Sequence, residues 1–247
     1  MRTAAALLAA GLLFAGAAHA AEIKVIGSPG LREAYNELVP QFEKATGHKV
    51  VTEWGGVNDV AKRVAAGEAA DVVLLPVAQI GDLTKAGKLD QTARADVAKS
   101  GVGIAVREGA AKPVIRNGED LKNALLKAKT ISYSTGPSGV HMAALIKQWG
   151  IEDRVKAKIV IAPSDTPVGV VVARGGAEIG FQQVSELIRI KGIQYLGPLP
   201  ADVQETTVFA AAVHKNAAAS EAAKALVKYL SAPAAATAIR KTGMEPG

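Results

Sequence analysis

The stretch EIKVIGSPGLREAYNELVPQF (residues 22–42) decides the fold, because it joins a strand, a tight turn and a helix without a spacer. Residues 22–26 predict a strand, and the helix that follows repeats apolar side chains at helical spacing. These are Leu31, Tyr35, Leu38, Val39 and Phe42. Ser28 therefore lies where a strand gives way to a helix. Backbone N–H groups are free for a bound anion at such a position.

An export signal precedes this stretch. Arg2 gives the start a positive charge, residues 4–18 form an almost unbroken apolar run, and Ala18-His19-Ala20 is a small-residue cleavage site. The run is too short to span and anchor. We predict that residues 1–20 are a signal peptide, that it is removed, and that the mature protein is periplasmic.

Composition bounds the function. Hydrophobic residues make up 49% of the chain, which is enough for a sizeable core, and cysteine is absent, which excludes disulfides and thiolate metal sites. The formal net charge of +6 suits an acidic ligand, but the basic residues are scattered, so nucleic acid is not an expected partner. Metal-ligand and cofactor motifs are not found, and we expect neither a metal nor a cofactor.

Strand and helix alternate along the chain. Residues 49–54 predict a strand, Asn58 is an N-cap for the next helix, and residues 71–75 predict a buried parallel strand. Further strands are predicted at 102–107, 130–134, 158–161, 178–182, 193–196 and 206–213, and helices at 120–127, 138–149, 168–173, 217–230 and 235–241. Repeated βα units build a doubly wound sheet whose ligands sit at the carboxyl ends of the strands.

Three hydroxyl-rich turns follow predicted strands, at residues 27–30, 134–139 and 163–167. Hydroxyls and the N–H groups of helix N-termini together bind oxyanions. Each serine or threonine can equally be a simple helix cap. Because strand ends converge in space, three such turns favour a single anion site.

Several motifs, taken in order, resemble a known family. They are the turn at 27–30, Trp54-Gly55-Gly56, AAGEAADVV (65–73), GAEIGF (176–181), GPLPA (197–201) and YLSAP (229–233). The series resembles type II periplasmic solute-binding proteins, and within them the molybdate-binding receptors of ABC importers. The resemblance implies a two-lobe α/β fold with mixed sheets, flanking helices and a ligand cleft between the lobes. It places lobe 1 at residues 22–102 plus 207–247 and lobe 2 at 103–206, and it implies a monomer.

The same resemblance implies the ligand contacts. One ligand serine of the family falls on Ser28, and a second falls near Val57, with Asn58 adjacent. A backbone contact falls on Ser138, and another falls near Asp165 or Thr166. A ligand tyrosine falls on Gln183, with Gln182 beside it. The loss of a hydroxyl at Val57 and the amide pair both favour an organic carboxylate over molybdate. Residues 182–187 (QQVSEL) resemble a branch of the family whose fold is shared with exported aconitate isomerases.

Two further residues bear on the ligand. Arg107 could hold a carboxylate bidentately, or be a solvated strand end beside Glu108. His141, three residues into a predicted helix, could face the cleft as a ligand or an acid/base group, or lie at the surface. The predicted ligand-binding set is Ser28, Asn58, Arg107, Ser134, Ser138, His141, Thr166, Gln182 and Gln183.

Three functions stay open. The leading hypothesis is a receptor that closes over a small anion and delivers it to the membrane subunits of an ABC importer. The alternative is a cofactor-free isomerase of a tricarboxylic acid, with His141 and Ser138 as its catalytic residues. The third is an exported carrier without a dedicated importer.

Overall fold

The structure is a computed structural model that describes residues 20–247, so the predicted signal peptide lies outside the described residues except for Ala20. The strands are β1 Glu22–Gly27, β2 Lys49–Trp54, β3 Val72–Pro76, β4 Leu89–Arg107, β5 Ile131–Tyr133, β6 Ile159–Ile161, β7 Ile179–Gln183, β8 Ile193–Pro198, β9 Thr206–His214 and β10 Glu245–Pro246. The α-helices are α1 Arg32–Thr46, α2 Val57–Ala65, α3 Val77–Lys85, α4 Gly118–Lys127, α5 Pro137–Gln148, α6 Glu152–Val155, α7 Val168–Ala173, α8 Val184–Leu187, α9 Ser220–Leu230 and α10 Ala236–Arg240. Short 3₁₀ turns occupy Pro29–Leu31, Lys156–Lys158 and Pro233–Ala235.

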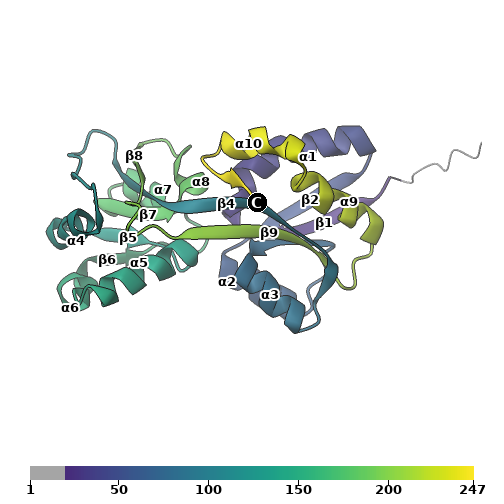
Figure 1. The fold of residues 1–247 in the computed structure, drawn as a ribbon, viewed down its shortest axis with the longest axis horizontal. Coiled ribbons are helices and arrows are strands. Elements are labelled where there is room, and N and C mark those ends of the chain that lie inside the picture. Colours follow the sequence, from purple (N-terminus) through teal and green to yellow (C-terminus); the bar gives the residue numbers. More distant parts are fainter. Residues whose placement is uncertain (1–19) are drawn as a thin grey trace, which may run out of the picture.

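The strands follow the order β2-β1-β3-β9-β4-β7-β5-β6, with β8 and β10 also paired to β4. Strands β4 and β9 run antiparallel and connect the two halves of the molecule (Figure 1). Residues 89–101 of β4 pair with β9, whereas Val102–Val106 pair with β7. The long strand β4 therefore passes from one sheet into the other near residue 101.

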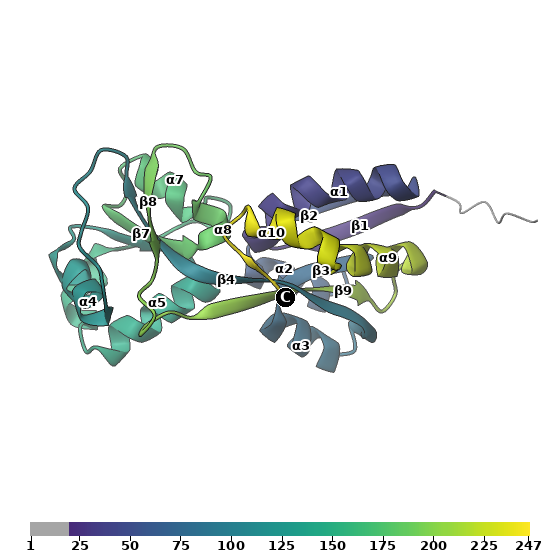
Figure 2. The same cartoon turned by 45° about the horizontal axis from the view of Figure 1, so that its top comes forward.

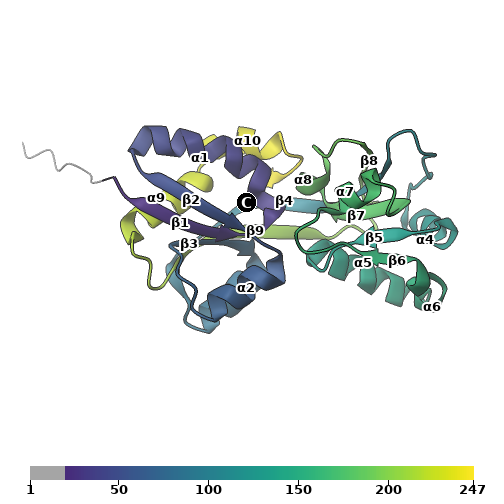
Figure 3. The same cartoon turned by 180° about the vertical axis from the view of Figure 1, so that it is seen from behind.

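The hydrophobic cores divide at the same place. One group of buried side chains packs β1, β3 and β9 against α1, α9 and α10. A second group belongs to the other half and includes side chains from the end of β4, from β5 and β7, and from α4 and α5. Figures 2 and 3 show α1, α9 and α10 on one face of the first sheet and α2 and α3 on the other. We propose residues 22–102 plus 207–247 as lobe 1 and 103–206 as lobe 2, and use these names below.

Helix α1 forms where the helical spacing of its apolar residues predicts it. Its apolar face is buried, with Tyr35 and Phe42 only 4% and 1% exposed. Gly47 ends the helix in the left-handed conformation, at φ 76°, and donates its N–H to the Glu43 carbonyl. Burial of this face holds α1 against the sheet. The glycine cap ends the helix at Gly47, so β2 can begin two residues later, at Lys49.

Three local expectations differ from the structure. Strand β4 begins at Leu89 and not at Val102, because its first half is polar and is paired to β9 through irregular register. Helices α3, α6 and α8 and the short strand β10 have no counterpart among the predicted elements. Asn58 is not an N-cap: α2 begins at Val57 with Gly56 in the cap position, which puts Asn58 within the first turn.

Within residues 20–247, the helices are all too short or too polar to cross a lipid bilayer.

Candidate functional site

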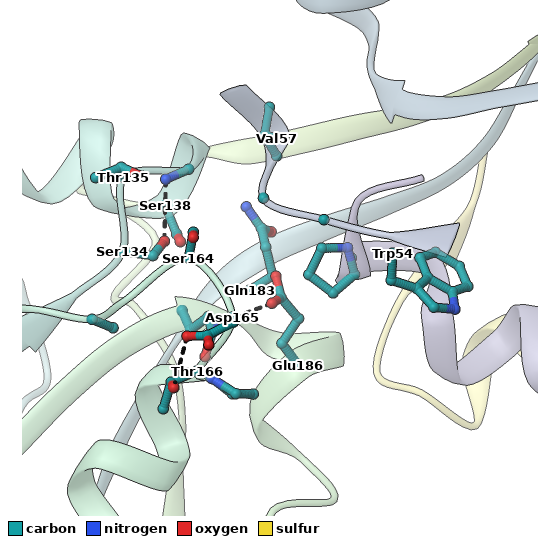
Figure 4. A pocket seen from close by; sticks show the side chains of 18 of the residues that line it. Trp54, Val57, Ser134, Thr135, Ser138, Ser164, Asp165, Thr166, Gln183 and Glu186 are labelled. Carbon is teal, nitrogen blue, oxygen red and sulfur yellow. Dashed lines mark hydrogen bonds between the residues drawn. The ribbon is translucent and has the colours of Figure 1, made fainter. Parts of the chain in front are cut away.

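A cavity of about 320 Å³ lies between the two lobes. Lobe 1 contributes the turn after β1, the turn after β2 and the start of α2, while lobe 2 contributes the turns after β5 and β6 and the end of β7. Figure 4 shows labelled side chains from both lobes around this space. The three predicted turns thus meet at one place, as the convergence of strand ends requires.

The second turn is held tightly against the helix that follows it. The Ser134 hydroxyl accepts a hydrogen bond from the Gly136 N–H at 3.2 Å (Figure 4). A Cβ atom at Gly139 would lie 1.6 Å from the Ser134 carbonyl oxygen, so only glycine allows this approach. Ser134 and Ser138 both line the cavity, and Ser138 is 2% exposed. The first N–H groups of α5 have no intrahelical acceptors and are available at this end.

The third turn forms the outer edge of the cavity. The Thr166 hydroxyl donates to Asp165 Oδ1 at 3.1 Å, and the Thr166 N–H donates to the Pro163 carbonyl at 3.1 Å. Both Asp165 and Thr166 line the cavity, and Asp165 is exposed. Ser164 reaches the opposite lobe, because a Cβ atom at Gly56 would lie 3.3 Å from the Ser164 Cβ.

The first turn places a buried hydroxyl beside the cavity. Ser28 is 1% exposed and its Oγ has no hydrogen-bond partner in the described chain. Its neighbours Pro29 and Gly30 line the cavity, and Phe209 fills the space where a Cβ at Gly30 would lie, 2.3 Å from its ring. A buried hydroxyl without a partner has lost its hydrogen bonds to water, which a ligand could restore.

The two predicted glutamines both line the cavity but differ in what they do there. Gln182 accepts the Val168 N–H at 2.8 Å and donates to Glu186 Oε2 at 2.6 Å. In the amide orientation that satisfies both ends, Gln183 accepts from the Thr207 hydroxyl at 2.9 Å and donates to Ser100 Oγ at 3.1 Å. Gln183 therefore braces the two connecting strands, and Gln182 orients Glu186.

Two cavity residues were missed from sequence. Arg32, at the start of α1, has its guanidinium carbon 5.2 Å from the centre of the Trp54 ring, and its buried Nε has no partner among residues 20–247. Glu186, on α8, also lines the cavity. Burial raises the pKa of the Glu186 carboxyl to about 7, although the hydrogen bond from Gln182 and the charge of Arg32 both favour its ionised form. The site thus holds one cation and one carboxyl that changes charge near neutral pH.

Arg107 does not lie at this cavity, and the prediction that it holds a ligand there is not supported by its position. It is exposed at the last position of β4, where it pairs with Ile193 of β8. Because β4 runs from lobe 1 through lobe 2, its carboxyl end lies on the side of lobe 2 away from lobe 1 (Figure 1).

His141 and Asn58 also lie outside the cavity lining. The His141 ring contacts the Val203 carbonyl at 2.7 Å and Glu205 at 2.6 Å, in the segment leading into β9. Asn58 is exposed and donates to the Thr135 carbonyl across the lobes at 3.4 Å. Asn58 lines a second cavity, of about 380 Å³, on the other side of this contact. Helical rise carries His141 one turn beyond Ser138 and away from the strand ends.

Further contacts hold the lobes together around the cavity. The Ser185 hydroxyl donates to the Gly30 carbonyl at 2.8 Å, and Arg189 lies 3.7 Å from Glu33. Together with the Asn58–Thr135 bond, they join α8 and the second turn of lobe 2 to lobe 1. A ligand in the cavity would be enclosed by both lobes in this arrangement.

Comparisons with known proteins agree with this fold. A family model described as bacterial extracellular solute-binding protein matches residues 23–245. An aconitate isomerase of Pseudomonas sp is 35% identical over 247 residues, covering 98% of this chain and 94% of that protein. The molybdate-binding protein ModA of Azotobacter vinelandii is 31% identical over 245 residues, covering 96% of this chain and 94% of that protein.

The solved structure of the Azotobacter vinelandii periplasmic molybdate-binding protein matches with a TM-score of 0.76 at 23% identity, over 90% of this chain and 98% of that one. The expected two-lobe α/β fold and the resemblance to molybdate-binding receptors are both confirmed. The chain therefore belongs to the family of bacterial extracellular solute-binding proteins.

Proposed function

We propose that the protein is periplasmic and binds a small polycarboxylic acid in the cavity between its lobes. The observation that carries this proposal is the position of Arg32. Its guanidinium lines the cavity, lies over Trp54 and keeps a buried Nε without a partner in the described part of the chain. A guanidinium recognises a carboxylate through two parallel hydrogen bonds, and an arginine held on an aromatic face is already oriented for it.

The rest of the lining favours an extended acid over a compact tetrahedral oxyanion. Val57 offers no hydroxyl where the molybdate receptors are expected to have one, and Gln183 is engaged by the connecting strands. The cavity volume of about 320 Å³ falls in the range of pockets that hold small organic ligands. Carboxylates separated along a carbon skeleton could reach Arg32 and the N-terminus of α5 at once.

Family membership supports delivery of the ligand to the membrane subunits of an ABC importer as the biological role. Solute-binding proteins of this fold act by binding their ligand more tightly in the closed state. The hydrogen bonds between lobes at Asn58 and Ser185 belong to such a closed arrangement. We propose that this protein acts as a monomer.

Calorimetric titration of the purified mature protein tests the ligand class. We expect saturable binding of citrate or of an aconitate isomer, and much weaker binding of molybdate, tungstate and sulfate. Tight molybdate binding without measurable affinity for any di- or tricarboxylate would overturn the proposal.

Ser28→Ala should separate a ligand contact from a helix cap. The Ser28 hydroxyl is buried and has no partner, so its removal should leave the melting temperature of the free protein unchanged or slightly higher. A lost bond from this hydroxyl to a carboxylate should lower affinity by about 10-fold or more. Melting curves and titrations of both proteins measure the two effects, and unchanged affinity would show that the ligand does not use Ser28.

A second candidate function is isomerisation of the bound acid. Glu186 favours it, because a carboxyl with a pKa of about 7 in a ligand cavity can accept and return a proton at neutral pH. The 35% identity to an aconitate isomerase over nearly the whole chain also supports it. Proton NMR of cis- and trans-aconitate with the protein would detect their interconversion. Spectra that stay unchanged would contradict this second candidate and leave the binding proposal intact.

A further inference from the structure

Glu186 is held at the cavity by a chain of two hydrogen bonds whose direction is fixed. The Val168 N–H can only donate, so it must face the oxygen of the Gln182 amide, at 2.8 Å. The Gln182 nitrogen then faces Glu186 Oε2 at 2.6 Å. Gln182 is the hydrogen-bond donor to Glu186 within residues 20–247, and it engages one of the two carboxylate oxygens. The second oxygen, Oε1, is available to a ligand.

The surroundings of Glu186 differ from those of the other acids at the cavity. Asp59 is exposed and lies 3.9 Å from Arg63, and Asp165 is exposed and accepts the Thr166 hydroxyl. Glu186 is instead half-buried beside the positive charge of Arg32, and burial raises the pKa of its carboxyl. In Figure 4 it lies between the turn at Asp165 and the side of the cavity formed by Trp54.

We propose that Glu186 is the catalytic residue that moves a proton between two carbons of a bound unsaturated polycarboxylic acid. This inference rests on the second candidate function. Ionised Glu186 would take a proton from the CH₂ group between a carboxylate and the double bond. The C–H electron pair then forms a new double bond, and the former double bond takes the proton back at its far carbon. One C–H bond breaks, another forms, and the double bond moves by one carbon, without an oxidant or a reductant.

Arg32 has a defined part in this step. Removal of the proton spreads negative charge from the carbon onto the carboxylates, and a fixed guanidinium stabilises that charge. Gln182 positions the base, since it holds one oxygen of Glu186 and leaves the other to meet the carbon-bound proton. Arg32 is held over the Trp54 ring and Gln182 is held by the Val168 N–H, so both side chains are oriented before reaction.

The test compares wild type with Glu186→Gln in two measurements on the same mature protein. Calorimetry measures binding of cis- and trans-aconitate, and NMR in D₂O measures isomerisation and the entry of deuterium at carbon. We expect Glu186→Gln, which keeps the shape of the side chain, to bind both acids as well as wild type or better. Its isomerisation should be at least about 100-fold slower, because general acid–base catalysis contributes roughly 10²- to 10⁴-fold.

The controls separate the two proposals. Glu221→Gln, on the exposed outer face of α9, should match wild type in both measurements. Glu186→Asp keeps a carboxylate and should retain part of the rate. Wild-type rate should rise with pH through about 7 and then level, because the ionised form of Glu186 is the base, and this step should vanish in Glu186→Gln.

Equal rates in wild type and Glu186→Gln would overturn the inference, as would loss of rate in His141→Gln with retention in Glu186→Gln. Wild type that binds aconitate but neither isomerises it nor exchanges its protons would also overturn it, with the binding proposal intact. Wild type that binds no polycarboxylate would instead refute the proposed function itself.

Discussion

Arg32→Ala is expected to lower affinity for a polycarboxylic acid by about 10- to 150-fold. A hydrogen bond to a charged group contributes ~1.5–3 kcal/mol, and the guanidinium is the cation in the cavity lining. The substitution also leaves the ligand charge and the carboxyl of Glu186 without the nearby positive charge that both now have. We therefore expect a larger loss for a tricarboxylate than for a monocarboxylate.

Calorimetry on Arg32→Ala, Arg32→Lys and Arg107→Ala measures this effect. Arg32→Lys should recover only part of the affinity, because an ammonium cannot make the two parallel bonds of a guanidinium. Arg107→Ala is the matched control, since it removes an exposed arginine from the far end of β4 and should leave affinity unchanged. The opposite result, with affinity lost at Arg107 and kept at Arg32, would contradict the site described here.

Gly139→Ala is expected to damage both stability and binding. The new Cβ would lie 1.6 Å from the Ser134 carbonyl oxygen, which belongs to the backbone, so the second turn must move away from α5. Overpacking of this kind costs about 1–3 kcal/mol. For a chain of this size, that lowers the melting temperature by roughly 2–12 °C. The moved turn carries Ser134 away from Ser138 of α5, and both line the cavity, so ligand affinity should fall as well.

Gly81→Ala is the matched control for this change. Gly81 lies inside α3, and a Cβ there would meet no atom within 4 Å. Alanine at such a helix position should raise stability by about 0.5–1 kcal/mol. Melting curves and titrations of both variants measure the difference. A Gly139→Ala protein as stable and as tight-binding as wild type would show that the turn adapts without consequence.

Much of the fold could be predicted because the pattern of each element is local. The apolar spacing of α1, the buried strand β3 and the three turns can be read from neighbouring residues. The first half of β4 could not, because a polar strand is stabilised by its pairing with β9 more than one hundred residues later. The sequence shows no periodicity that reports such a pairing.

The site was predicted in part for the same reason. Turns at strand ends converge in any sheet of this kind, so Ser134, Ser138 and Thr166 could be placed together. Arg32 lies outside the apolar spacing of α1, and the pattern gives no sign that this first residue of the helix borders a cavity. The burial of Glu186 depends on how lobe 2 meets lobe 1, which is tertiary information. The nearest sequence signal is its spacing of four residues from Gln182.

Strand β9 has a consequence for the order in which the chain can fold. It lies between β3 and β4 in the sheet, yet the chain reaches it only after the whole of lobe 2. During synthesis, the N-terminal strands would emerge without this neighbour and with the apolar edge of β3 unpaired. Contacts this distant in sequence form slowly. Proposed lobe 2 is continuous in the chain and has its own hydrophobic core, so we expect it to form first and to act as the template that brings the returning strand into register.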